Sequence, residues 1–378
     1  MWVDYARRAL GRSRDARIAI RRTLSWRRVF SDQAGGDRKA AAAPASGVHQ
    51  DGRIPKAPSP PRRVTLAQIR KWYVEKRPIV MLTAYDYPAA VHADLAGIDI
   101  VLVGDSVGMV ELGYDTTQYV SMDDMIHHCR AVHTGARRPY IVGDMPFGSY
   151  EVSAERAMDN AFRFIQAGKV NAVKLEGGIR SAHTVHRIVQ SGVAVMGHTG
   201  LTPQSVSAIG SFRPMGQTFD EARQILQDCL ALQEAGAFAI VLECIPERLA
   251  AQITSALSIP TIGIGAGRHT SGQVLVYHDL VGMLTHPHHA KVVPKFCKRY
   301  ARVGEYVNNA LEQYRDEVRS RTFPDDAYSP YSIADDEFER FREYAESVAK
   351  KSNSPITESS TAQGQAPPDS IQPEEKIY

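Results

Sequence analysis

The sequence of 378 residues predicts an α/β protein of the (β/α)8 TIM-barrel class, with one folded domain between a disordered N-terminal leader and a disordered C-terminal tail. Two observations lead to this fold class. Short runs rich in Val and Ile alternate about eight times with longer amphipathic stretches, which is the pattern of a parallel sheet with crossover helices. Without its two ends the chain keeps roughly 260 to 290 residues, the usual size of one such barrel.

Eight apolar runs are expected to form the strands of the barrel. They are "IVMLTAYD" (79 to 86), "IDIVLVGDS" (98 to 106), "YIVGDMP" (140 to 146), "AVKLEGG" (172 to 178), "AVMGHTG" (194 to 200), "FAIVLECIP" (238 to 246), "TIGIGAG" (261 to 267) and "QVLVYHD" (273 to 279). The stretches between them carry helix signals. For example, one opens on Ser153 and closes on Gly168, and another closes on Gly236.

The two ends of the chain differ in composition from the middle. Residues 1–33 are predicted to be a mitochondrial transit peptide, because this segment is rich in Arg, poor in acids and amphipathic. A basic arm for nucleic acid and a leader without an address are the alternatives. A Pro-, Ala- and Gly-rich linker is expected over 34–63, the catalytic barrel over 64–349, and a disordered tail over 350–378.

Composition restricts the possible partners. The net charge is only +3 and much of the positive excess lies in the leader, so a nucleic-acid surface on the folded part is not expected. The sequence has no uninterrupted run of eighteen apolar residues, so a membrane span is not expected either. The four cysteines are widely scattered without metal-ligand spacing, which is typical of free thiols.

Acidic residues recur at the C-terminal ends of the predicted strands, where TIM barrels carry their active sites. The second strand ends with Asp105 and Ser106, the third with Asp144, and the fourth with Lys174 and Glu176. Lys174 and Glu176 lie two residues apart in a strand, so they point to the same face. The alternatives are a structural salt bridge for this pair, and helix N-caps for one or two of the acids.

Two further residues extend this pattern. The fifth strand carries His198, and the sixth carries Glu243. Several carboxylates at one point repel each other unless they are protonated or neutralised by a cation. Oxygen ligands with few His and no Cys favour Mg²⁺. A cation of this kind suits chemistry on an oxo acid, with Glu243 as the general base and Lys174 neutralising the developing oxyanion.

Several motifs together resemble the ketopantoate hydroxymethyltransferase family of pantothenate biosynthesis, also called 3-methyl-2-oxobutanoate hydroxymethyltransferase. The resemblance extends in order from about Thr65 to Tyr331. The motifs that carry it are "LTAYDYP", "LVGDSVGM", "GDMPFGSY", "VKLEGG", "GHTGLTPQS", "LECIP", "IPTIGIGAG" and "GQVLVYHDLVGM".

The resemblance implies a TIM barrel that assembles as a homo-oligomer, a decamer in known bacterial members, and that binds Mg²⁺. It implies 5,10-methylenetetrahydrofolate as the one-carbon donor and 3-methyl-2-oxobutanoate as the acceptor. The implied residues, matched to this sequence, are metal ligands Asp105, Asp144 and Glu176; substrate-binding Asp105, Ser106, Asp144 and Lys174; the proton acceptor Glu243; and His198 of the motif after the fifth strand.

A magnesium-dependent oxo-acid lyase or mutase of the isocitrate lyase and phosphoenolpyruvate mutase type is the alternative enzyme class. Such lyases usually carry a catalytic cysteine in a K-K-C-G-H stretch, which this sequence lacks. A barrel that serves only as a scaffold predicts gaps among the site residues, and the sequence has none.

The glycines Gly263, Gly265 and Gly267 follow one another at every second position. We favour the interpretation that they allow another group to come close to the backbone, rather than that they bind phosphate. We expect residues 285–296, with three histidines, to form a surface loop rather than a second metal site.

Overall fold

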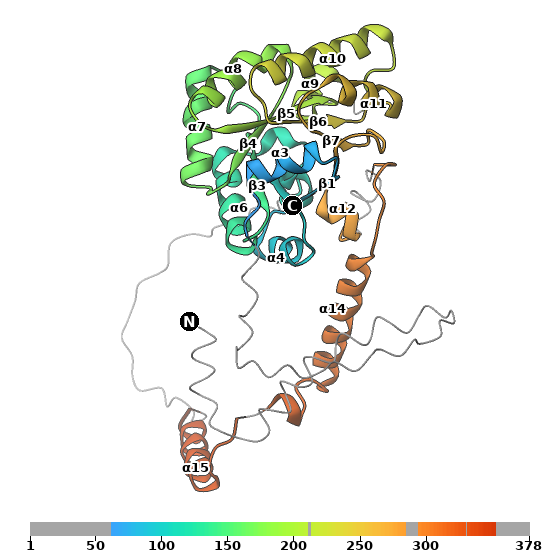
Figure 1. The fold of residues 1–378 in the computed structure, drawn as a ribbon. Helices are drawn as coiled ribbons and strands as arrows, with labels where there is room; N and C mark the ends of the chain where they lie inside the picture. The colour runs from blue at the N-terminus through green and yellow to red at the C-terminus, as the bar shows by residue number, and fades with distance from the viewer. Residues whose placement is uncertain (1–61, 211–212, 285–293, 330, 353–378) are drawn as a thin grey trace, which may run out of the picture. The chain divides into compact units, whose positions relative to one another are not determined.

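The computed structural model describes residues 62–210, 213–284, 294–329 and 331–352, and its strands close into a parallel barrel. The eight strands pair in sequence order, and the eighth pairs with the first. Helices lie around these strands (Figure 1). This confirms the predicted fold class. The strands are β1 (Ile79–Thr83), β2 (Ile100–Val103), β3 (Tyr140–Asp144), β4 (Ala172–Glu176), β5 (Ala194–Gly200), β6 (Ala239–Glu243), β7 (Thr261–Ile264) and β8 (Gly272–Leu275).

Most strands end earlier than the apolar pattern predicted. The predicted first strand extended to Asp86, whereas β1 ends at Thr83. Asp86 instead begins helix α4 (Tyr87–Leu95), because its side chain accepts a hydrogen bond of 2.7 Å from the free N–H of Ala89. The loops therefore start inside the predicted runs, and the residues after each strand are free to form the active end of the barrel.

The helices between the strands begin and end at the signals seen in the sequence. Ser153 caps α7 (Ala154–Gln166) by accepting from the N–H of Arg156. Gly236 follows α10 (Phe219–Glu234) with a φ of 97°, a left-handed conformation that favours glycine. The other long helices are α3 (Leu66–Val74), α6 (Met122–Gly135), α8 (Ile179–Gln190), α11 (Glu247–Ala256), α14 (Val303–Ser320) and α15 (Asp335–Ser352).

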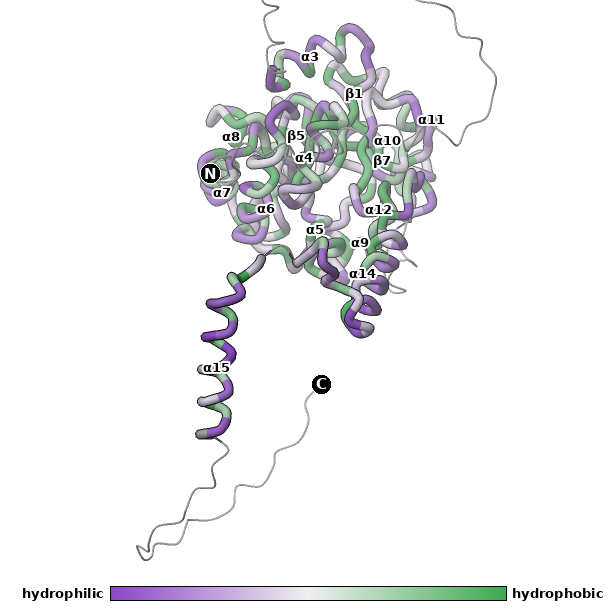
Figure 2. Tube along the Cα trace, turned by 90° about the horizontal axis from the view of Figure 1, so that it is seen from below, coloured by the Kyte–Doolittle hydropathy of each residue, from purple (hydrophilic) through white to green (hydrophobic). Residues whose placement is uncertain are grey.

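The core has two layers because strand side chains alternate between the inside of the barrel and the helices outside it. Ala172 of β4 packs in the inner layer, whereas Val173 and Leu175 pack in the outer layer. Lys174 and Glu176 must therefore share the inner face with Ala172, as the sequence predicted. The tube in Figure 2 shows the apolar strands enclosed by helices that carry hydrophilic faces.

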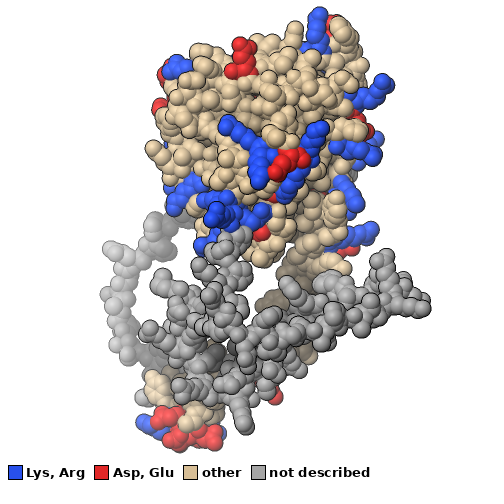
Figure 3. Space-filling view, viewed as in Figure 1, with Lys and Arg blue, Asp and Glu red and all other residues tan. Residues whose placement is uncertain are grey.

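The chain continues beyond β8 into α12 (Tyr277–Val281) and the long helices α14 and α15. The side chains of residues 335–350 in α15 are all exposed, and the helix extends two residues past the predicted start of the tail. Within the described residues, no helix has the length and apolar character needed to cross a membrane. On the face in Figure 3, basic and acidic side chains lie interspersed, as expected for a small net charge.

Candidate active site

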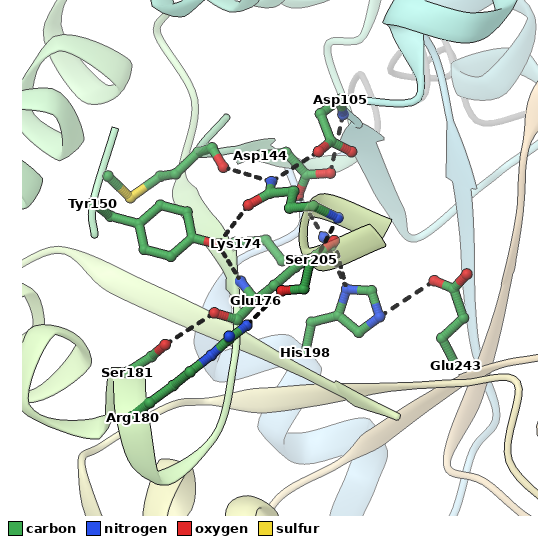
Figure 4. Close-up of polar contacts among 12 residues, drawn as sticks. Asp105, Asp144, Tyr150, Lys174, Glu176, Arg180, Ser181, His198, Ser205 and Glu243 are labelled. Atoms are coloured by element: carbon green, nitrogen blue, oxygen red, sulfur yellow. Dashed lines mark hydrogen bonds and ion pairs between the residues drawn. The ribbon is translucent and has the colours of Figure 1, made fainter. Parts of the chain in front are cut away.

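The predicted site residues meet at one end of the barrel, which we call the rim: the C-terminal ends of β2 to β6. Asp144, Glu176 and Glu243 are the last residues of β3, β4 and β6. Asp105 follows β2 by two residues, and His198 lies in β5 opposite Glu176. Figure 4 shows these side chains converging on one another. Because neighbouring strands are parallel and in register, residues far apart in sequence reach the same level of the barrel.

Lys174 forms a buried ion pair at the centre of the rim. Its Nζ lies 2.8 Å from Oδ1 of Asp144, and both side chains are at most 5% exposed. Burial by itself lowers the pKa of Lys174, but the carboxylates of Asp144 and Glu176 raise it above its ordinary value. Lys174 therefore stays charged and compensates part of the negative charge of the rim.

Asp105 and Asp144 are the two carboxylates that lie next to each other. The backbone N–H of Asp105 donates to Oδ2 of Asp144 at 3.1 Å. Burial and the charge of Asp144 raise the pKa of Asp105 to about 7. A carboxyl group with such a pKa holds a proton near neutral pH unless a cation replaces it, which is the behaviour expected of a metal ligand in the absence of its metal.

Glu176 is buried on the opposite side of the lysine. Its Oε2 accepts a hydrogen bond of 3.0 Å from the backbone N–H of Gln204, and its Oε1 lies 3.6 Å from Nδ1 of His198. Burial and repulsion by Asp105 raise the pKa of Glu176 well above its ordinary value. Glu176 thus adds a third acidic group to the rim, held by neutral partners.

His198 connects the lysine to Glu243. Its Nδ1 lies 3.4 Å from Nζ of Lys174, and its Nε2 lies 3.2 Å from Oε2 of Glu243 without a well-aligned hydrogen bond. Burial and the charge of Lys174 lower the pKa of His198, so the ring is neutral at pH 7. The side chain of Glu243 is 17% exposed, whereas that of His198 is 3% exposed. Of these two side chains, that of Glu243 is therefore the one that solvent or a substrate reaches.

The donor set at the rim fits a hard divalent cation. Oδ1 of Asp144 is buried and accepts no hydrogen bond, although it pairs with Lys174. Mg²⁺ is usually bound by one or two carboxylates together with water and substrate oxygens. Within the described ranges, no group of three or more His, Cys, Asp or Glu side chains is arranged to enclose a metal ion. The full ligand set of Asp105, Asp144 and Glu176 therefore stays a prediction.

Two buried residues of the site were not singled out from the sequence. Gln204, from η3 (Pro203–Ser205), donates from Nε2 to Oδ2 of Asp105 at 2.8 Å. Tyr150 donates from its hydroxyl group to Oε1 of Gln204 and accepts from the backbone N–H of Glu176 at 3.2 Å. Both residues belong to motifs that are prominent in the sequence, "GHTGLTPQS" and "GDMPFGSY", but no spacing rule assigns a contact to a loop residue.

Ser106, predicted to bind substrate, lies beside the aspartates and shares a hydrogen bond of 2.7 Å with the hydroxyl group of Tyr85.

Cys244 follows Glu243 directly. Burial raises the pKa of its thiol to about 12, so it is not a nucleophile at neutral pH. The thiol of Cys244 is therefore not assigned a role in a covalent reaction step.

The glycines after β7 are explained by packing. Gly265 and Gly267 have φ values of 62° and 76°, and a Cβ on either would lie within 3 Å of Phe296 or Glu247. This is close approach to the protein itself, and it agrees with the interpretation that we favoured over phosphate binding. The prediction of a surface loop for the three histidines of 285–296 concerns His286, His288 and His289, which lie outside the described residues.

A cavity of about 620 Å³ borders the rim between the ends of β4 and β5. Gly177, directly after Glu176, and Gly200, which pairs with Glu243 in the sheet, form part of its wall. Apolar side chains such as Ile209 and Met215 line it together with Arg180 and the acidic side chains of Glu221 and Asp228. The cavity thus offers space for an amphiphilic molecule next to the acidic residues.

Comparisons with known proteins identify relatives over most of the chain. Residues 63–326 match the family described as ketopantoate hydroxymethyltransferase. A protein of Arabidopsis thaliana named 3-methyl-2-oxobutanoate hydroxymethyltransferase 1, mitochondrial, is 55% identical over 288 residues, covering 76% of this chain and 83% of the relative. A protein of Carboxydothermus hydrogenoformans named 3-methyl-2-oxobutanoate hydroxymethyltransferase is 48% identical over 278 residues, covering 74% and 99%.

Among solved structures, a phosphonopyruvate hydrolase in complex with oxalate and Mg²⁺ aligns with a TM-score of 0.47 and 13% identity. The alignment covers 76% of this chain and 98% of that one. We draw no functional conclusion from so distant a likeness.

Proposed function

This chain belongs to the ketopantoate hydroxymethyltransferase family, and we propose from that premise that it transfers a hydroxymethyl group from 5,10-methylenetetrahydrofolate to 3-methyl-2-oxobutanoate. The products are 2-dehydropantoate and tetrahydrofolate, and one water is consumed. The enzyme then serves pantothenate and coenzyme A biosynthesis. The observation that carries the proposal is the convergence of three carboxylates, a lysine and a His–Glu pair on the rim.

Glu243 is the general base that removes the proton from C3 of the oxo acid. It is the most exposed acid of the rim, with its side chain 17% exposed, so a bound substrate reaches it. His198 stays neutral and its Nε2 lies 3.2 Å from Oε2 of Glu243, so the residue in contact with this carboxylate carries no fixed positive charge. After proton transfer, C3 forms a bond to the one-carbon unit of the donor. Both bonds from this carbon to the folate nitrogens break, and the consumed water supplies its hydroxyl oxygen. The proton from C3 and a proton from the water end on the two nitrogens of tetrahydrofolate.

Asp105, Asp144 and Glu176 are the proposed ligands of a divalent cation, Mg²⁺ in the first instance. A cation bound there would withdraw electron density from the keto oxygen of the substrate and so make the C3 proton more acidic. Lys174 holds Asp144 in an ion pair and supports the substrate oxygens with its positive charge. Ser106 and the two aspartates line the part of the rim where the oxo acid would bind.

The cavity between β4 and β5 supports the proposed folate donor. A reduced folate has a flat ring, an aromatic linker and an anionic tail, so it needs an apolar slot with a cation at its margin. The wall of the cavity combines Ile209 and Met215 with Arg180, and it includes Gly200 and Gly177, the residue after Glu176. A donor bound in this cavity would lie beside the ends of β4 and β5.

The alternative lyase or mutase activity is not favoured. Relatives at 44–57% identity carry the transferase name, and the family match covers 63–326. Lyases of that type usually carry a catalytic cysteine in a K-K-C-G-H stretch, and this sequence has no such stretch.

Proton NMR of 3-methyl-2-oxobutanoate in D₂O tests the proposal in two stages. The full chain with Mg²⁺, without folate, should remove the C3–H signal, and EDTA should prevent this loss. Addition of 5,10-methylenetetrahydrofolate should then produce 2-dehydropantoate. Absence of product with both substrates and Mg²⁺ present would refute the proposed activity.

We propose the domain boundaries and the location together. Residues 1–33 act as a mitochondrial transit peptide, 34–63 as a linker, 64–349 as the catalytic barrel and 350–378 as a tail. The plant relatives carry "mitochondrial" in their names. A reporter fused to residues 1–63 should enter mitochondria, and cytosolic fluorescence would refute this.

We also propose that the barrel assembles as a homo-oligomer, a decamer by family resemblance. Sedimentation velocity measures the number of subunits.

A further inference from the structure

Gln204 is a buried neutral residue in the middle of an acidic site. It lies in η3 (Pro203–Ser205), after β5, and is 2% exposed. Its backbone carbonyl accepts a hydrogen bond of 2.7 Å from Nε2 of Gln118, which lies in η2 (Thr117–Tyr119) between β2 and β3. Two short helices that follow different strands thus meet at Gln204.

Every polar atom of the Gln204 side chain has a defined partner. Nε2 donates to Oδ2 of Asp105 at 2.8 Å and to the backbone carbonyl of Met145 at 2.9 Å. Oε1 accepts from the hydroxyl group of Tyr150, and that hydroxyl accepts from the backbone N–H of Glu176. Because the backbone carbonyl of Met145 can only accept, the amide nitrogen of Gln204 must face Met145 and Asp105, and the amide oxygen then accepts from Tyr150. The network admits one orientation of the amide.

The same residue also holds a second acid. The backbone N–H of Gln204 donates to Oε2 of Glu176 at 3.0 Å. Gln204 therefore contacts Asp105 and Glu176 at once, using one oxygen of each carboxylate. Lys174 performs the corresponding task for Asp144. Neither the side-chain amide, which contacts Asp105, nor the backbone N–H, which contacts Glu176, carries a net charge, so Gln204 orients both carboxylates without competing electrostatically with a bound cation.

We propose that Gln204 is a positioning residue that orients the carboxylates of Asp105 and Glu176 for a divalent cation. The inference rests on the proposed metal site. Groups that hydrogen-bond a metal ligand fix its orientation, and their loss typically weakens metal binding about 10- to 100-fold. Tyr150 belongs to the same unit, because its hydroxyl group donates to the amide oxygen and so supports the orientation in which the amide nitrogen faces Asp105.

Calorimetric titration of the full chain with Mg²⁺, without oxo acid, tests the role of Gln204. Gln204→Met keeps the length of the side chain but removes all three side-chain hydrogen bonds, so the Kd for Mg²⁺ should rise about 10- to 100-fold. Proton exchange at C3 should recover when Mg²⁺ is raised to saturation, because Gln204 contacts no reacting atom. Gln166→Met is the matched control: Gln166 is exposed at the end of α7, and its replacement should leave the Kd unchanged.

A Gln204→Met variant with the Kd of the wild type would overturn the inference. If this variant does not fold by circular dichroism, Tyr150→Phe decides: it removes only the hydroxyl group that orients the amide, and the Kd should rise about threefold or more. An unchanged Kd in Tyr150→Phe then overturns the inference. A wild-type enzyme that binds Mg²⁺ but forms no 2-dehydropantoate with both substrates present would instead refute the proposed function, so the two failures are distinguishable.

Discussion

Replacement of Glu243 by glutamine separates the proposed base from the metal site. In the structure, Oε2 of Glu243 lies 3.2 Å from Nε2 of His198, and the side chain is 17% exposed. Glutamine has the same shape and keeps an oxygen for His198, so the packing should not change. The amide cannot accept the C3 proton, however, so the variant removes the base and little else.

The expected loss follows from what a general base contributes. Positioned bases accelerate proton transfer about 100- to 10,000-fold, which corresponds to about 3 to 5 kcal/mol in the activation free energy. Glu243→Gln should therefore lower the rate of C3–H exchange in D₂O by about this factor at saturating Mg²⁺. The Kd for Mg²⁺ should stay at the wild-type value, because Glu243 is not among the proposed ligands.

Glu247→Gln provides a matched control for this experiment. Glu247 opens α11 only four residues further along, and its side chain is 45% exposed, away from the acidic cluster. Its replacement should leave exchange at the wild-type rate. Exchange by Glu243→Gln within about threefold of the wild-type rate would place the base elsewhere. A large loss of Mg²⁺ affinity in Glu243→Gln would show that Glu243 is a ligand instead.

Three further predictions test the electrostatics and the backbone of the rim. Lys174→Met leaves Asp144 buried without its cation, so the free energy of unfolding in urea should fall by about 3 to 5 kcal/mol, and a loss below about 1 kcal/mol would contradict the ion-pair argument. Asp105 has a pKa raised to about 7 by burial and by Asp144, and a cation must displace its proton. The Mg²⁺ affinity should therefore fall up to about tenfold per pH unit below about 7 in calorimetric titrations, and a flat profile would refute the assignment of Asp105 as a ligand. Gly200→Ala forces a Cβ to within 2.3 Å of the Glu243 carbonyl at a φ of 91°, so the melting temperature should drop by several degrees, and an unchanged value would contradict this close approach of the two strands.

The strand pattern of the sequence was sufficient to predict much of the site. Alternation in a strand places Lys174 and Glu176 on one face, and the parallel barrel places the ends of all its strands at one rim. Asp105, Asp144 and Glu243 could therefore be nominated before any contact was known. These rules depend only on local alternation or on topology, so they can be applied before the tertiary structure is known.

Strand ends were predicted less well than strand positions. Apolar residues continue past the last ladder hydrogen bond, as after β1, where Tyr85 is fully buried although it lies outside the strand. Hydrophobicity reports burial, and buried residues near the rim lie in loops as well as in strands. The boundary is set instead by which backbone groups find ladder partners, which is a property of the neighbouring strand.

The sequence by itself determined the barrel and the acidic character of its rim, because both follow from periodicity and chain order. Only the tertiary structure decided which side chains meet. Gln204 reaches Asp105 across 99 positions of the sequence, and His198 stands between Lys174 and Glu243. These contacts depend on loop conformations and on the closure of the sheet, which arise from long-range packing and leave no periodic signal in the chain.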